Sequence, residues 1–142
     1  MSFDLSAITR TGGLFGPQRI LIYGVQGLGK TTFGCSFEAP ILLRTEDGAG
    51  ALDVATFPTI AASYQDICDA IQALHGEHPF RTLVLDSLDW LEPLVLAKTC
   101  GDLGIEHIED AAYGKGYVTA DDNWRFIMGG LDSLRHNRGM TV

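Results

Sequence analysis

Short apolar runs alternate along the chain with longer segments in which apolar residues recur every three or four positions. The runs "RILIY" (19–23), "PILLRT" (40–45) and "RTLVLDS" (81–87) are nearly continuous, which is typical of strands buried on both faces. A shorter run, "FPTIAA" (57–62), predicts a further strand. Because strands that alternate with helices need crossover connections, the pattern predicts a mostly parallel central sheet between two helical layers, a three-layer α/β fold.

The segments between these runs predict four helices. They are expected over 30–38, from an N-cap at Ser63 to a closing glycine at 76, over 88–99, and from 121 or 122 to about 137. Asp66, three residues after Ser63, completes a variant of the capping box. The apolar positions of the second and last helices are expected in the core: Ile67, Ala70, Ile71, Leu74, Trp124, Ile127, Met128, Leu131 and Leu134.

Three further features concern the limits of the helices and the end of the sequence. Pro93 is expected in the first turn of the helix over 88–99, because a proline further inside removes a hydrogen bond. Four glycines leave 101–120 without a clear period, so Asp121 or Asp122 is expected to cap the last helix. The final residues, 140–142, resemble the start of another strand.

Length and composition indicate one domain. The 142 residues carry a net charge of −8 and are 46% hydrophobic, with no apolar run near the roughly 18 residues of a membrane span and no secretory signal pattern. Residues 1–17 are expected to be a flexible N-terminal segment, and 18–142 a single domain. A strong stand-alone nucleic-acid binder would need a basic face, which ten Lys and Arg residues do not provide.

Cysteine usage favours a reducing compartment, so the chain is expected in the cytoplasm, with no membrane contact. An odd number of widely spaced cysteines argues against a disulfide framework or a zinc site, and the histidines are expected at the surface. The residues are Cys35, Cys68, Cys100, His75, His78, His107 and His136.

The stretch "GVQGLGKTT" follows the first apolar run and fits the phosphate-binding loop, G-x-x-x-x-G-K-[ST]. Glycines allow a tight turn whose amides point at an anion, and the following helix adds positive potential at its N-terminus. Lys30 is expected at the β- and γ-phosphates of ATP, and the Thr31 hydroxyl on Mg²⁺. The predicted nucleotide-binding residues are Gly24, Val25, Gln26, Gly27, Leu28, Gly29, Lys30, Thr31 and Thr32.

Carboxylates stand at the ends of two other predicted strands. Asp86 ends "LVLD" and is predicted to bind Mg²⁺ through a water, or alternatively to cap the next helix. Glu46, with Asp47 as the alternative, follows the strand over 40–45 and is the candidate to orient the water that attacks the γ-phosphate. Because ligands of parallel sheets bind at the carboxyl ends of strands, these residues are expected to converge on the loop.

Three stretches follow one another in the order seen in RecA-like P-loop ATPases: the glycine-rich loop, "ILLRTEDGAGALD" and "LVLDSLDWL". The chain resembles this family, and more closely the phage-encoded ATPases of single-strand annealing recombination. The resemblance covers roughly 18–142. It implies a RecA-like core in which Glu46 activates water and Asp86-Ser87 follows the Mg²⁺ strand. It also implies a further strand with a γ-phosphate sensor and a DNA loop; since the sequence ends at Val142, inside that strand, the domain is expected to be incomplete.

The resemblance further implies DNA and protein partners. Its other DNA loop falls in 101–120, where Tyr113 and Tyr117 flank Lys115 and could stack on bases of single-stranded DNA. Such ATPases act as homo-oligomers with a neighbour's arginine at the γ-phosphate, and here a phage annealing or single-strand-binding protein is a further expected partner, in the host cytoplasm. The candidate arginines are Arg125, Arg135 and Arg138.

Three other functions stay open. A GTPase fits the D-x-x-G spacing of 47–50, but no N-K-x-D motif is present. A small-molecule kinase would need arginines in a lid, and 101–120 has none. A nucleotide-dependent assembly module would bind ATP with negligible hydrolysis. The sequence therefore favours a Mg²⁺-dependent ATPase that couples ATP to single-stranded DNA recombination or annealing.

Overall fold

A parallel sheet forms the centre of the molecule. The computed structural model describes residue 6, residues 16–48, residue 50 and residues 52–142. Within them, β1 (Pro40–Arg44) lies between β2 (Ala55–Thr56) and β3 (Thr82–Asp86), and both pairings are parallel. The predicted α/β class and parallel sheet are confirmed at this level. Most of the predicted N-terminal segment 1–17, and residue 49 of the D-x-x-G match, lie outside the described residues.

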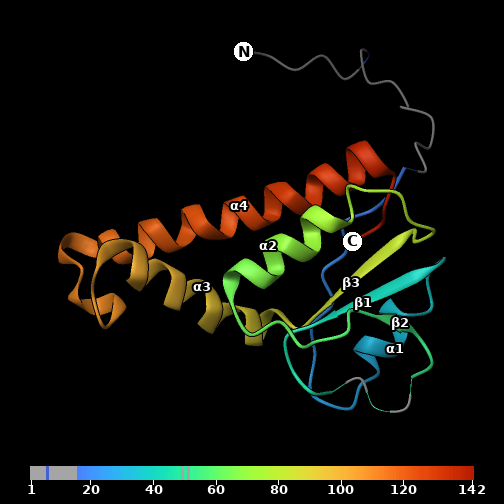
Figure 1. The fold of residues 1–142 in the computed structure, drawn as a ribbon, viewed down its shortest axis with the longest axis horizontal. Helices are drawn as coiled ribbons and strands as arrows, with labels where there is room; N and C mark the ends of the chain where they lie inside the picture. The colour runs from blue at the N-terminus through green and yellow to red at the C-terminus, as the bar shows by residue number, and fades with distance from the viewer. Residues whose placement is uncertain (1–5, 7–15, 49, 51) are drawn as a thin grey trace.

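Helices lie on both faces of this sheet (Figure 1). α1 (Lys30–Gly34) lies on one face, and α2 (Tyr64–Ala73) and α4 (Lys115–Arg138) lie on the other. α3 (Leu88–Leu103) extends from the end of β3 and packs along α4, which η2 (Ile108–Asp110) and η3 (Ala112–Gly114) precede. In the part of the chain that the structure describes, every helix is too short or too polar to cross a membrane.

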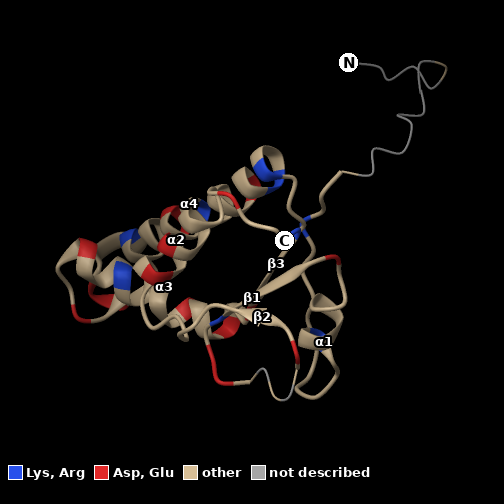
Figure 2. Ribbon diagram, turned by 45° about the vertical axis from the view of Figure 1, so that its right-hand side comes forward, with Lys and Arg blue, Asp and Glu red and all other residues tan. Residues whose placement is uncertain are grey.

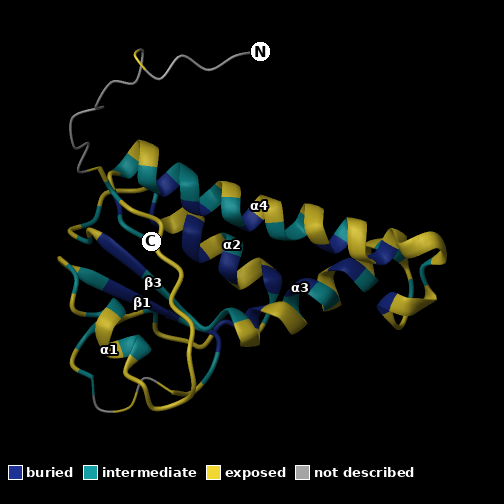
Figure 3. Ribbon diagram, turned by 180° about the vertical axis from the view of Figure 1, so that it is seen from behind, coloured by how far each residue is buried: buried dark blue, intermediate teal, exposed yellow. Residues whose placement is uncertain are grey.

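The core lies between the sheet and the helices α2, α3 and α4 (Figure 3). The apolar positions expected in the core of α2 are buried, and so are three of the five expected in α4, the other two being half-buried. The Ser63 capping box is confirmed, since its hydroxyl accepts a hydrogen bond from the Asp66 amide and the Asp66 carboxylate accepts one from the Ser63 amide. The most buried side chains include Leu42, Leu43, Ile67, Leu83, Leu91, Val95, Ile127, Leu134 and Met140.

The prediction of a buried strand over 19–23 is wrong. The amide of Ile20 donates to the carbonyl of Val142 at 2.8 Å, and the amide of Val142 donates to the carbonyl of Gln18 at 2.8 Å, so only the start of the segment pairs. Residues 19–23 form no strand, and the side chains of Leu21 and Tyr23 are 71% and 87% exposed. Figure 3 shows this segment as an exposed trace that passes β3. A cavity of about 680 Å³, lined by this segment and β3 among others, extends to the loop before α1.

The third predicted strand is shorter and earlier than expected. β2 covers Ala55–Thr56 rather than 57–62. Phe57 still donates its amide to Leu42, but Pro58 has no N–H to continue the ladder. Beside β1, the next amide that bonds is that of Ala61, which donates to Arg44 at 2.8 Å. The proline therefore ends the strand while the chain still follows β1.

Three helix limits also differ from the predictions. α1 ends at Gly34 instead of 38, where the amide and hydroxyl of Ser36 both bond the carbonyl of Phe33. α3 continues to Leu103 and contains Pro93 in its interior rather than in its first turn. α4 begins at Lys115, after Gly114 with a φ of 69°, so neither Asp121 nor Asp122 is its cap.

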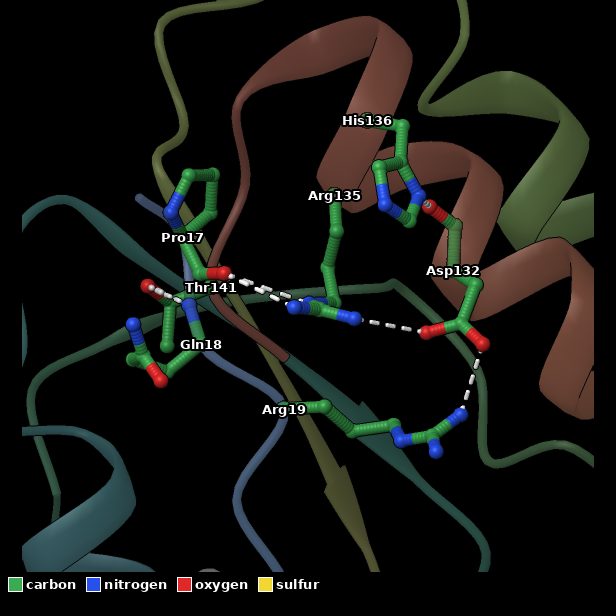
Figure 4. A network of polar contacts seen from close by, with 7 residues as sticks. All are labelled: Pro17, Gln18, Arg19, Asp132, Arg135, His136 and Thr141. Atoms are coloured by element: carbon green, nitrogen blue, oxygen red, sulfur yellow. Dashed lines mark hydrogen bonds and ion pairs between the residues drawn. The ribbon is translucent and has the colours of Figure 1, made fainter. Parts of the chain in front are cut away.

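The start of the segment that leads to the glycine-rich loop, at residues 17–19, is held against α4 by a network of polar contacts (Figure 4). Asp132 accepts hydrogen bonds from Arg19 at 2.7 Å and from Arg135 at 2.9 Å. Arg135 also donates to the carbonyl of Pro17. The hydrogen bond from Arg135, and then the charges of both arginines, lower the pKa of Asp132 below its ordinary value.

Candidate functional site

The glycine-rich loop connects the exposed segment to α1 and has the backbone conformation that its glycines permit. Gly27 and Gly29 have φ values of 81° and 90°, a region that side chains with a Cβ rarely adopt. Gly29 is also the N-cap of α1. Gly24, the first glycine of the motif, has a φ of 154°, which residues with a Cβ also rarely adopt. The predicted loop residues Gly24–Gly29 are exposed.

Lys30 lies across this loop. Its ammonium group donates hydrogen bonds to the carbonyl oxygens of Gly24 at 2.7 Å and Val25 at 3.1 Å. A full positive charge is thus placed beside the loop, at the start of α1. The site can accept an anion such as a phosphate group there, because the ammonium has exchangeable donors and lies at a helix N-terminus.

Thr31 and Asp86 lie in direct contact. The Thr31 hydroxyl donates to the Asp86 carboxylate at 2.6 Å, and both residues are half-buried. Thr31 comes from the first turn of α1 and Asp86 from the end of β3, so the contact joins two segments that lie 55 residues apart. Thr32, the next hydroxyl, is exposed.

Glu46 lies at the neighbouring strand end and is also held. Ser87 donates its hydroxyl to the Glu46 carboxylate at 2.8 Å. Ser87 is in turn bonded to Thr45: the Thr45 hydroxyl accepts from the Ser87 amide and donates to the Ser87 carbonyl, each at 2.7 Å. Asp47 is exposed and makes no hydrogen bond or ion pair within the described residues. The structure therefore places Glu46, and not Asp47, against the residue that follows Asp86.

Thr45 belongs to this cluster although the sequence patterns did not single it out. Thr45 is 7% exposed and lies between the end of β1 and the candidate carboxylate, and this position is the signal that could have identified it. Burial, and then the charge of Asp86, raise the pKa of the Cys35 thiol. The Cys35 thiol is therefore neutral at pH 7 and does not add to the negative charge of the site.

These side chains fit a divalent cation with a phosphate ligand. Mg²⁺ prefers oxygen ligands and is held in proteins by one or two carboxylates together with waters and phosphate oxygens. Thr31 and Asp86 offer a hydroxyl and a carboxylate at one point, in the cavity that Lys30 also lines. In the described ranges, no group of three or more His, Cys, Asp or Glu residues could hold a metal by itself. A bound Mg²⁺ would thus rely on the nucleotide for part of its coordination.

The residues predicted to contact DNA lie elsewhere in the molecule. Tyr113 and Lys115 lie where η3 meets α4, at the end of the helical layer far from α1 (Figure 1). The Tyr113 side chain is fully exposed, with a φ of 56°, and that of Tyr117 is 59% exposed. Acidic residues surround them in the sequence, and Figure 2 shows the blue Lys and Arg positions of α3 and α4 interspersed with red Asp and Glu positions.

The three candidate arginines all have partners within the described structure. Arg125 pairs with Asp121 at 2.7 Å, and Arg135 takes part in the network of Figure 4. Arg138 donates to the carbonyl of Gly76. None of the three lines the cavity beside the loop. The structure therefore does not bring them together with Lys30, Thr31 and Asp86.

Comparison with known proteins gives one match. A protein-family model described as an AAA domain matches residues 16–141, which include the loop, β1, β3 and the strand-end carboxylates. A search of the curated proteins and a search of the solved structures each found no match. The matched residues make up most of the 142-residue chain. The chain therefore belongs to the AAA domain family, whose members are nucleotide-binding domains of the P-loop ATPase type.

Proposed function

We propose that residues 18–142 bind ATP with Mg²⁺ at the glycine-rich loop and hydrolyse it. The observation that carries this proposal is the 2.6 Å contact between the Thr31 hydroxyl and the Asp86 carboxylate, which line the same cavity as Lys30. Two oxygen ligands and one cation at the start of a helix are what a Mg²⁺–triphosphate needs. Membership of the AAA domain family supports the same function.

Each residue of the site has a chemical task in this proposal. The loop amides and Lys30 bind the phosphate oxygens, and Lys30 exchanges its bonds to the Gly24 and Val25 carbonyls for bonds to phosphate. Thr31 and Asp86 would hold Mg²⁺, which neutralises charge on the phosphates when it is bound. Glu46 orients a water towards the γ-phosphate and accepts its proton. Glu46 is preferred to Asp47 because Ser87 holds its carboxylate at the strand end.

The finer proposal concerns the process that hydrolysis serves. The order of the loop, Glu46 and Asp86-Ser87 supports a RecA-like ATPase that acts in single-strand annealing recombination of a phage, in the host cytoplasm. The exposed rings of Tyr113 and Tyr117 on either side of Lys115 are the residues we assign to single-stranded DNA. A homo-oligomer and an annealing or single-strand-binding protein belong to this proposal as partners.

The test is ATP turnover with Mg²⁺, with and without single-stranded DNA, together with nucleotide affinity. Lys30→Ala is expected to weaken ATP binding by at least about tenfold, because a charged hydrogen bond contributes about 1.5–3 kcal/mol. Lys98→Ala is the matched control, since that lysine pairs with Asp102 on α3, away from the loop. Glu46→Gln is expected to retain ATP binding and lose turnover.

Two outcomes would change the proposal. Tight ATP binding with turnover equal to that of Lys30→Ala would overturn hydrolysis and leave the nucleotide-dependent assembly module. Turnover that single-stranded DNA does not stimulate, or that Lys115→Ala leaves equally stimulated, would overturn the DNA role while hydrolysis stands.

A further inference from the structure

Ser87 occupies the N-cap position of α3 without capping the helix through its side chain. An N-cap serine ordinarily accepts a hydrogen bond from an amide of the first helical turn. Here no side-chain cap bond is present, and the hydroxyl donates to Oε1 of Glu46 at 2.8 Å instead. The favourable local bond of the helix is thus replaced by a bond to a residue 41 positions earlier.

Thr45 fixes the position from which Ser87 donates. Its amide donates to the carbonyl of Asp86 at 2.8 Å, in register with the β1–β3 pairing. Its hydroxyl then bonds both the amide and the carbonyl of Ser87. Three hydrogen bonds therefore join Thr45 to two consecutive residues at the end of β3. Because Thr45 is 7% exposed, water competes little for these bonds.

We infer that Thr45 and Ser87 are positioning residues that hold the Glu46 carboxylate in the orientation needed to direct the attacking water. This inference rests on the proposed hydrolysis. A free glutamate side chain samples several rotamers, whereas a water-orienting carboxylate must be placed to within about half an ångström. The bond from Ser87 occupies Oε1 and leaves Oε2 as the acceptor for water. Thr45 links this carboxylate to β3, which carries Asp86.

The main test compares turnover with affinity. Ser87→Ala is expected to lower kcat by roughly tenfold to a hundredfold, the cost of a misplaced catalytic group, with the Kd for ATP within about twofold. Ser87→Thr retains the hydroxyl and restores kcat. Ser133→Ala, on α4, is the matched control with unchanged kcat. In a Glu46→Gln background, Ser87→Ala has no additional effect, because Ser87 acts through Glu46.

Thr45→Val tests the second positioning residue, with its unfolding midpoint measured alongside. It retains the shape of threonine and removes both bonds to Ser87, so kcat is expected to fall as in Ser87→Ala, and Thr45→Ser restores it. If Thr45→Val does not fold, Thr45→Ser with full kcat beside Thr45→Ala with reduced kcat supports the same role. Full kcat in a folded Thr45→Val protein would overturn the role of Thr45.

A second measurement does not depend on turnover. In nucleotide-free protein, the carboxyl ¹³C resonance of Glu46 is expected to shift in Ser87→Ala and to stay in place in Ser133→Ala. An unshifted resonance, or an active protein whose kcat Ser87→Ala leaves unchanged, would overturn the inference. If the wild type binds ATP without turnover and the resonance shifts, the proposed hydrolysis and the catalytic positioning fail together, and the shift then reports only a structural bond. If turnover is present and the resonance shifts without loss of kcat, positioning fails alone.

Discussion

Gly116 provides the sharpest test of how the second half of the molecule is built. It is the second residue of α4 and is buried against η2. A Cβ at this position would lie 2.5 Å from the carbonyl oxygen of Ile108 and 2.7 Å from its Cγ1. The first of these atoms belongs to the backbone, which cannot move away at little cost. We therefore expect Gly116→Ala to destabilise the protein.

The size of the effect follows from two opposing contributions. Replacing a helical glycine by alanine gains up to about 1 kcal/mol of helix propensity. Overpacking a contact that must shift costs roughly 1–3 kcal/mol. Because the gain offsets part of this cost, the net expectation for Gly116→Ala is a loss of up to about 2 kcal/mol. Gly129, in the same helix, is exposed, and a Cβ added there would meet no atom within 4 Å, so Gly129→Ala should gain about 1 kcal/mol.

The assay is equilibrium unfolding in urea, followed by circular dichroism on both variants and the wild type. The two substitutions are chemically identical and lie in one helix, so opposite signs isolate the contact with Ile108. Because both variants gain the same helix propensity, their expected separation is the overpacking cost itself, roughly 1–3 kcal/mol. Equal stabilisation by Gly116→Ala and Gly129→Ala would refute the packing of α4 on η2 and indicate an open loop over 101–120.

Three other predictions concern titration and exposure. Burial raises the pKa of Tyr64 to about 12. The stability that the neutral hydroxyl contributes is therefore complete below the unfolded pKa of about 10 and is lost as the pH rises towards 12. The titration is measured by phenolate absorbance of the wild type, with Tyr64→Phe as the reference. The lowered pKa of Asp132 contributes stability that is present above about pH 4 and is lost as the pH falls through the pKa of the folded state. The urea midpoint of Asp132→Asn should therefore fall less on acidification than that of the wild type. Amides of residues 21–23 should exchange with solvent far faster than those of residues 41–43, and equal protection in a hydrogen-exchange experiment would contradict the exposed segment.

Local signals in the sequence predicted the elements that depend on local interactions. The Ser63–Asp66 capping box needs residues only three positions apart, and it forms as expected. The strands β1 and β3 also appear where their apolar runs lie; β1 is buried at residues 41–43, and β3 is buried at residues 82–83 and half-buried beyond them. The glycine spacing of the loop likewise predicted a turn that requires positive φ, which Gly27 and Gly29 adopt.

The segment 19–23 shows what an apolar pattern leaves open. The run predicts that the residues would be stable when buried, but burial requires neighbouring strands at the right place. Only the residues beside Val142 find such a partner, and Leu21 and Tyr23 are exposed. The glycines of 101–120 raise the same difficulty. Gly116 indicated a break in the helix, yet its lack of a side chain is what allows α4 to approach the Ile108 carbonyl.

The candidate site depends on strand register as much as on motifs. The sequence placed Glu46 and Asp86 at the ends of separate strands but left Asp47 as an alternative. The register pairs Arg44 with Asp86, so the chain beyond β1 meets the first residue after β3. Thr45 then bonds Ser87, and the next residue along the chain is the one within reach of the Ser87 hydroxyl. A slip of one position would exchange the two acidic residues, because successive side chains of an extended strand point to opposite sides. The hydrogen bonds between Thr45 and Ser87 therefore determine which of the two carboxylates the Ser87 hydroxyl reaches, and this long-range contact cannot be predicted from the sequence order alone.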